Sequence, residues 1–139
     1  MSNAIAGVGT QFKRGDGSSS EQFTAIAEVN DISGPELNRE FYDVTSLDST
    51  GGWREFIAGF RDAGNVVLNM NFTLASFSDL WEDYNDSDSH NYQIVLPNTE
   101  ATVLEFAGYV INLPWTIPTD DKITVAVTIK VDGQPTLTS

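Results

Sequence analysis

The segment 66–74, with the sequence VVLNMNFTL, shows the clearest regular pattern in the chain. Apolar side chains occupy every second position, at Val66, Leu68, Met70, Phe72 and Leu74. The positions between them hold a valine, two asparagines and a threonine. Because successive side chains of a β-strand point to opposite faces of the sheet, this alternation predicts a strand with one buried face.

Further segments on both sides share this character. Strands are predicted at 23–29, 41–47, 92–96, 102–113 and 122–131. Turn-forming residues separate them, as in the sequence ISGP at 32–35 and PNTE at 97–100. We find no internal repeat and no alternation of strands with long helices, so an all-β architecture is favoured over an α/β one.

One helix interrupts the strands. Phe77, Leu80, Trp81 and Tyr84 follow the i, i+3, i+4, i+7 spacing of an amphipathic helix. Ser76, three residues before Asp79, resembles a capping box, so the helix is predicted at about 77–85 with Trp81 and Tyr84 facing inward. The fold class expected is mainly β, a β-sandwich or barrel-like domain with one flanking α-helix.

Two regions lack this regularity. Residues 1–21 are rich in glycine and serine and are predicted to form a flexible arm, made locally cationic by Lys13 and Arg14. Residues 43–64 are predicted to form a long loop, in which Trp53, Phe56 and Phe60 follow a helix-like spacing among several glycines. The remainder, 22–139, is one domain that includes this loop.

Composition limits the possible functions. The chain of 139 residues is 40% hydrophobic and 19% charged, which fits one globular domain. Its 20 acidic and 7 basic residues give a net charge of -13, which argues against a DNA-gripping surface. Without cysteine there is no disulfide framework and no thiol nucleophile. We expect no secretion signal and no membrane segment.

Candidates for chemistry are weak. The segment 83–90 alternates oxygen ligands as a calcium loop does, but Asp88 occupies the position of the required glycine and Ile94 that of the final ligand. His90 is the only histidine, and no serine lies in a Gly-x-Ser-x-Gly turn. Carboxylate pairs such as Glu100 with Glu105 are uninformative among so many acids. We therefore predict no catalytic residue, metal or cofactor.

Several segments carry a family resemblance. They are the sequence ISGP at 32–35, Arg39, YDVTSLDS at 42–49 and WREFIAGFRDAG at 53–64. In these segments the chain resembles the major tail tube proteins of bacteriophages with long, non-contractile tails. The resemblance implies a β-sandwich with one flanking helix that forms hexameric rings, which stack into a tube for genome ejection.

The same resemblance implies partners and contact residues. The loop and the arm would reach neighbouring subunits and rings through a set of charged and aromatic side chains: Lys13, Arg14, Arg39, Asp48, Trp53, Arg54, Phe56, Phe60 and Arg61. Partners would be further copies of the chain, the tape measure, tail tip or initiator and tail terminator proteins, and double-stranded DNA that passes without tight binding. The protein would be made in the host cytoplasm and reside in the virion tail. The acidic excess is hypothesised to line the channel from one sheet face.

Other interpretations remain open from the sequence. A β-sandwich also suits a carbohydrate-binding module, because three tryptophans and four tyrosines could form a sugar-stacking face. A secreted hydrolase is less favoured because titratable groups do not cluster. A related tail protein, such as a terminator, shares the expected architecture.

Overall fold

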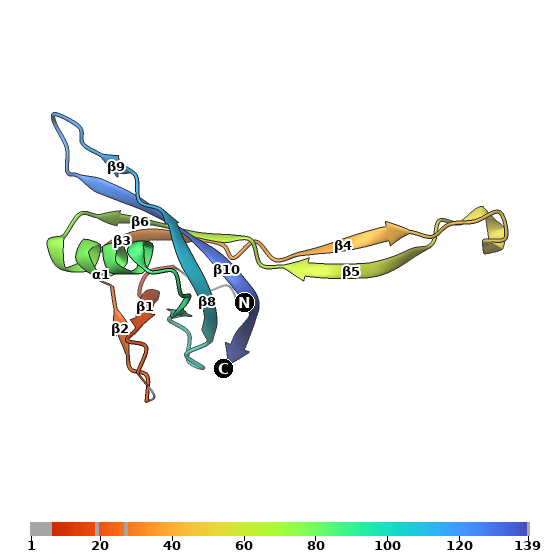
Figure 1. The fold of residues 1–139 in the computed structure, drawn as a ribbon, viewed down its shortest axis with the longest axis horizontal. Helices are drawn as coiled ribbons and strands as arrows, with labels where there is room; N and C mark the ends of the chain where they lie inside the picture. The colour runs from red at the N-terminus through yellow and green to blue at the C-terminus, as the bar shows by residue number, and fades with distance from the viewer. Residues whose placement is uncertain (1–6, 19, 27, 139) are drawn as a thin grey trace.

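The computed structural model describes residues 7–18, 20–26 and 28–138 (Figure 1). In chain order the elements are β1 (Gln11–Gly15), β2 (Phe23–Ala25), β3 (Val29–Ser33), β4 (Asn38–Asp43), a 3-10 turn (Thr50–Gly52), β5 (Phe56–Asp62), β6 (Asn65–Asn71), α1 (Leu74–Asn85), β7 (His90–Val95), β8 (Val103–Asn112), β9 (Trp115–Thr116) and β10 (Thr124–Thr138). The predicted class, mainly β with one helix, is confirmed.

Eight strands form one antiparallel sheet. Its order is β2-β1-β7-β8-β10-β6-β3, and the short β9 also pairs with β10. The register between β8 and β10 shifts at Thr128/Ile129 and again between Asp132 and Thr136. Such irregularities bend a strand and increase its twist. The strands β2 and β3 form the two edges of this sheet.

The core lies on one face of the sheet. Val66, Leu68 and Met70 of β6 are fully buried, as are alternate residues of the neighbouring β10. The pairing places Val127 opposite Leu68, so the apolar faces of the two strands coincide. The predicted alternation is therefore confirmed up to Asn71. It ends there because the helix starts at Leu74, whose side chain is exposed.

The helix α1 starts three residues earlier than predicted. Its N-cap is Thr73, whose hydroxyl accepts a hydrogen bond from the backbone N–H of Ser76 at 3.4 Å. The buried face consists of Ser76, Leu80 and Asp83. The inward orientation predicted for Trp81 and Tyr84 is wrong, because these side chains are 50% and 46% exposed.

The predicted N-terminal arm is wrong for residues 11–15, which form β1 inside the sheet. Phe12 is only 1% exposed and stacks on Tyr92 of β7, with 5.5 Å between the ring centroids. One large apolar residue thus anchors a segment otherwise composed of polar residues and glycine. Residues 1–6 and 19 of the expected arm lie outside the described residues.

The predicted loop at 43–64 is instead the outer part of a long hairpin. The strands β4 and β5 pair antiparallel as a separate two-stranded sheet that projects from the body (Figure 1). The segment 53–60, in spite of its helix-like spacing, therefore does not form a helix. Pairing along the ladder, for example Tyr42 with Ile57, determines the local structure instead.

Candidate subunit interface

The tip of the β4–β5 hairpin is held by local hydrogen bonds. The Asp43 carboxylate accepts from the Thr45 N–H at 2.9 Å and from Arg54 Nη1 at 3.0 Å. These bonds, those from Thr45 first, lower the pKa of Asp43. At the turn, Gly51 and Gly52 have φ of 68° and 74°, which glycine adopts at little cost. The sequence therefore specifies a reversal at this point.

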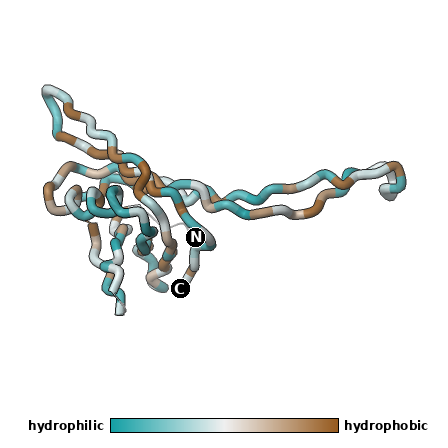
Figure 2. Tube along the Cα trace, in the orientation of Figure 1, coloured by the Kyte–Doolittle hydropathy of each residue, from teal (hydrophilic) through white to brown (hydrophobic). Residues whose placement is uncertain are grey.

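The hairpin exposes an unusual number of large apolar side chains. Trp53 is 77% and Phe60 is 82% exposed, and Leu47 is fully exposed. Six others are at least 46% exposed: Leu37, Phe41, Tyr42, Val44, Phe56 and Ile57. Figure 2 shows apolar segments along the ribbon and near its tip. A large exposed apolar surface marks an interaction site, and a two-stranded ribbon is at best marginally stable alone. The hairpin is thus built for contact with another molecule.

Two arginines face each other at the base of the hairpin. The register places Arg39 opposite Arg61. Like charges directly opposite in a ladder are destabilising. Neither side chain forms an ion pair with another described residue, whereas Arg54 at the tip pairs with Asp43 at 3.0 Å. An anionic partner beside Arg39 and Arg61 would relieve their repulsion.

A groove runs along the base of the hairpin and the end of β10, with a volume of about 1010 Å³. Its apolar lining includes Phe41, Phe60, Leu104 and Leu137. Leu137 is largely exposed, so the groove is open to solvent. Together with the hairpin it forms one continuous surface for contact.

Arg14 lies elsewhere and is engaged within its own subunit. Its Nε and Nη2 donate to the buried Asp83 carboxylate of α1 at 2.8 and 2.7 Å. Tyr92 donates its hydroxyl to the same carboxylate at 2.6 Å. The Asp83 hydrogen bonds raise the pKa of Arg14, while burial first and then the bond to Asp83 raise the pKa of Tyr92. Arg14 therefore has an internal role that the sequence did not predict, and its contact with another subunit stays a prediction.

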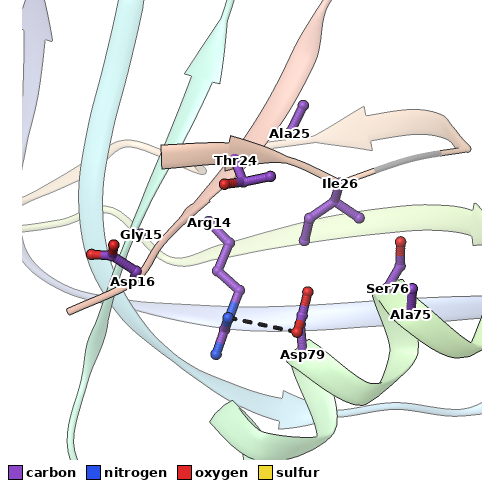
Figure 3. Close-up of a pocket in the computed structure, with 9 residues that line it drawn as sticks. All are labelled: Arg14, Gly15, Asp16, Thr24, Ala25, Ile26, Ala75, Ser76 and Asp79. Carbon is purple, nitrogen blue, oxygen red and sulfur yellow. Dashed lines mark ion pairs between the residues drawn. The ribbon is translucent and has the colours of Figure 1, made fainter. Parts of the chain in front are cut away.

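A small pocket of about 320 Å³ lies beside this ion pair, between β1, β2 and α1 (Figure 3). Arg14 Nη1 is 3.8 Å from Asp79 Oδ1 across it. The charged groups here pair with one another, so they serve to join β1 to the helix. Lys13, the neighbouring predicted contact residue, lies on β1 opposite Gln93.

The acidic side chains of the segment 83–90 also form contacts within the subunit. Asp83 binds Arg14 and Tyr92, whereas Asp86 Oδ2 lies 3.1 Å from His90 Nε2. The hydrogen bond from the Asp88 N–H, followed by His90, lowers the pKa of Asp86. Within residues 7–18, 20–26 and 28–138, no three His, Asp or Glu side chains are arranged to hold a metal ion. No helix in those residues has the length and apolarity to span a bilayer.

The sequence reasoning missed one surface, which we name the aromatic cluster: Phe72, Phe77, Trp81, Tyr84 and Trp115. Ring centroids are 5.2–6.0 Å apart, from Phe77–Trp115 to Phe77–Trp81. Trp81, Tyr84 and Trp115 are each about half exposed. The helix spacing of Phe77, Trp81 and Tyr84 gave a signal, but it indicated burial in the core. Instead the rings form a partly exposed layer at the end of α1.

The structure as a whole defines a class of protein. One helix packs on an antiparallel sheet with open edges, and a long apolar hairpin projects from it. The charged side chains around Asp83, which the sequence offered for chemistry, are paired with one another. These features define a structural subunit whose surfaces serve assembly.

The comparisons with known proteins then identify the family. Residues 6–138 match the family model described as lambda phage tail tube protein, TTP. The chain belongs to this family, and it is a structural subunit of the tail tube of a phage particle. This assignment selects the tail tube among the alternatives that the sequence left open. A search of the curated proteins returned no match.

Solved structures share the fold. A chain from the tail of an empty gene transfer agent particle, refined with C6 symmetry, has a TM-score of 0.82 and 23% identity, covering 98% of this chain and 100% of that one. A chain from the sheath–tube complex of an extracellular contractile injection system, PVC, has a TM-score of 0.73 and 12% identity, covering 100% and 94%. The SPP1 tail tube protein has a TM-score of 0.66 and 8% identity, covering 96% and 78%.

Proposed function

We propose that six copies of the chain close into a ring and that rings stack into the hollow tube through which the genome passes. The projecting hairpin is the observation that carries this proposal. Its apolar side chains lack a cover within the described chain, so they need a neighbouring subunit. A similar fold forms a tail with C6 symmetry in the gene transfer agent particle, which supports a six-membered ring.

The ring has a physical basis in the open edges of the sheet. The edge strands β2 and β3 leave backbone hydrogen-bonding groups available on their outer sides. A head-to-tail contact between unlike surfaces forms a ring when its rotation closes. Contacts between sheet edges within a ring would pair the free backbone groups. Contacts of the hairpin between rings would cover its exposed apolar side chains.

The hairpin residues form the proposed contacts between rings. They are Arg39, Asp48, Trp53, Arg54, Phe56, Phe60 and Arg61, with Lys13 and Arg14 on β1 as further candidates. Arg39 and Arg61 would meet acidic side chains of the neighbour, which the net charge of -13 makes abundant. Trp53 and Phe60 would bury aromatic surface, the commonest kind of interface anchor.

The channel needs a wall that does not hold DNA. We propose that the sheet face opposite the core forms this wall and that acidic side chains contribute to it. This face carries Asp31 beside Asn69 and Glu105 beside Gln93, with Lys130 among its basic residues. Carboxylates on the wall would repel phosphate, and few basic residues would release few counterions from passing DNA. We propose a structural role without catalysis, with tape measure, initiator and terminator proteins as further partners.

Electron microscopy of the purified protein tests this function. The sample is concentrated in raised salt, because screening weakens repulsion between acidic subunits. Hollow tubes or stacked six-membered rings are the expected result. Monomers that persist in raised salt, even with tail-initiator complexes added, would contradict the proposal.

A further inference from the structure

The aromatic cluster and the hairpin tip lie at opposite ends of the molecule. β5 ends at Asp62 and β6 begins at Asn65, so β6 runs away from the base of the hairpin. Its seven residues span about 23 Å before Phe72 and α1. Figure 1 shows the hairpin extending from one side of the body, with α1 and β9 at the other.

The side chains of the aromatic cluster pack closely against one another. Phe72 and Phe77 pack at 5.4 Å, and each contacts Trp115 of β9 edge-on at 5.3 and 5.2 Å. Trp81 and Tyr84 extend this layer along the helix, stacked at 5.9 Å. The exposed Leu74 and Ile117 lie close by in sequence. Such a rigid apolar layer suits a flat aromatic or aliphatic side chain from another molecule.

The hairpin tip is most exposed at its apolar side chains. Leu47 is fully exposed and Trp53 is 77% exposed, whereas Arg54, the one basic residue between Asp43 and Glu55, is paired with Asp43 at 3.0 Å. α1 contains Asp79, Glu82 and Asp83 and no basic residue. A contact between the tip and the aromatic cluster is therefore made by apolar surfaces, and raised salt would screen the acidic residues around it.

We propose that the aromatic cluster is the docking site for the hairpin tip of a second copy of this chain in the adjacent ring. Leu47 and Trp53 of the incoming tip cover Trp81 and Tyr84. This inference rests on the proposed function and names the surface that receives the hairpin. Because the two surfaces differ and lie at opposite ends, the contact repeats head-to-tail and stacks rings in one direction.

Cross-linking tests this contact, since the chain has no cysteine of its own. Two single variants, Leu47→Cys and Tyr84→Cys, are mixed, assembled, and treated with a short bismaleimide. Both positions are exposed, and each variant is first checked for an unchanged thermal transition. A covalent dimer is expected from the mixture of the two. The matched control replaces Tyr84→Cys by Leu137→Cys, which places the thiol in the groove at the hairpin base.

The outcomes separate the two proposals. Tubes with a dimer from the Leu47 and Tyr84 variants support both. Tubes that yield the dimer with Leu137→Cys instead, or yield none, overturn this inference and leave the tube intact. An absence of tubes overturns the proposed function as well as the inference.

Discussion

At the scale of single residues, Asp83 joins three elements. Its carboxylate accepts two hydrogen bonds from Arg14 of β1 and one from Tyr92 of β7. The side chain is fully buried on α1. A buried carboxylate is tolerated only when it is paired and hydrogen-bonded. The three partners thus explain how a charged residue occupies the inner face of the helix.

Removing this charge should cost stability. Asp83→Asn removes the carboxylate that hydrogen-bonds Arg14 and leaves only the longer contacts with Asp79 and Glu82, so we expect the free energy of unfolding to fall by about 3 kcal/mol. Urea denaturation followed by circular dichroism measures this change. The exposed Glu82→Gln is the matched control and should cost little. Equal losses in both variants would contradict the role assigned to Asp83.

Tyr92 should make stability depend on alkaline pH. Its folded pKa is raised, whereas an unfolded tyrosine titrates at about pH 10. The unfolded state therefore loses its proton first, and the free energy of unfolding should decline as pH rises above about 10. Tyr92→Phe should remove this part of the decline. The exposed Tyr84→Phe should retain it, so the pair distinguishes Tyr92 from general alkaline effects.

At the scale of elements, the strands that contact the core on one side were predicted best, whereas the strands predicted at 23–29 and 41–47 overlap β2 and β4 only in part. In β6 and β10, buried positions alternate with more exposed ones, and the sequence shows this as an alternation of apolar and polar side chains. β4 is exposed along its whole length, so its sequence contains no such contrast. β1 depends on Phe12 alone among small and polar residues. The helix face was misassigned because its inner side carries the charged Asp83, and charged residues are seldom buried.

The candidate interface was likewise predicted only in part. Trp53, Arg54, Phe56, Phe60 and Arg61 were selected through the family resemblance, and the structure places them on one hairpin. Arg14 was selected with them, but its partner Asp83 is 69 residues away. A pairing of this range leaves no local sequence pattern. The aromatic cluster likewise depends on Trp115, which meets Phe77 only through the fold.

Trp53 should matter for assembly and not for the fold. It is 77% exposed at the hairpin tip, so Trp53→Ala should leave the thermal transition of the monomer unchanged. The lost interface anchor should lower the yield of tubes seen by electron microscopy. Val8→Ala, also at a highly exposed apolar residue, is the control and should assemble normally. A lower transition temperature for Trp53→Ala would place the side chain in the core instead.

At the scale of the whole molecule, the body and the hairpin are separable. The eight-stranded sheet and α1 contain the core, while β4 and β5 form a sheet of their own. In the proposed tube, the open edges of the sheet would serve growth within a ring and the hairpin would serve growth between rings. This separation allows the contribution of each to be measured alone.

Replacing residues 38–62 by a short glycine-containing turn should yield a folded subunit that does not form tubes. The core residues remain, so a cooperative thermal transition is expected. Light scattering and electron microscopy would show monomers or single rings without stacking. Tubes formed by this variant would show that ring stacking does not require the hairpin.

The exposure of the hairpin also bears on the timing of growth. A two-stranded ribbon with little support from the body is ordered mainly by contact with a neighbouring subunit. The hairpin therefore loses conformational entropy when a subunit docks. The first layer has no template and should form slowly, whereas each later layer adds to an ordered surface. Polymerisation should therefore show a lag that preformed seeds abolish, so a pool of like-charged subunits can persist until a starting platform is complete.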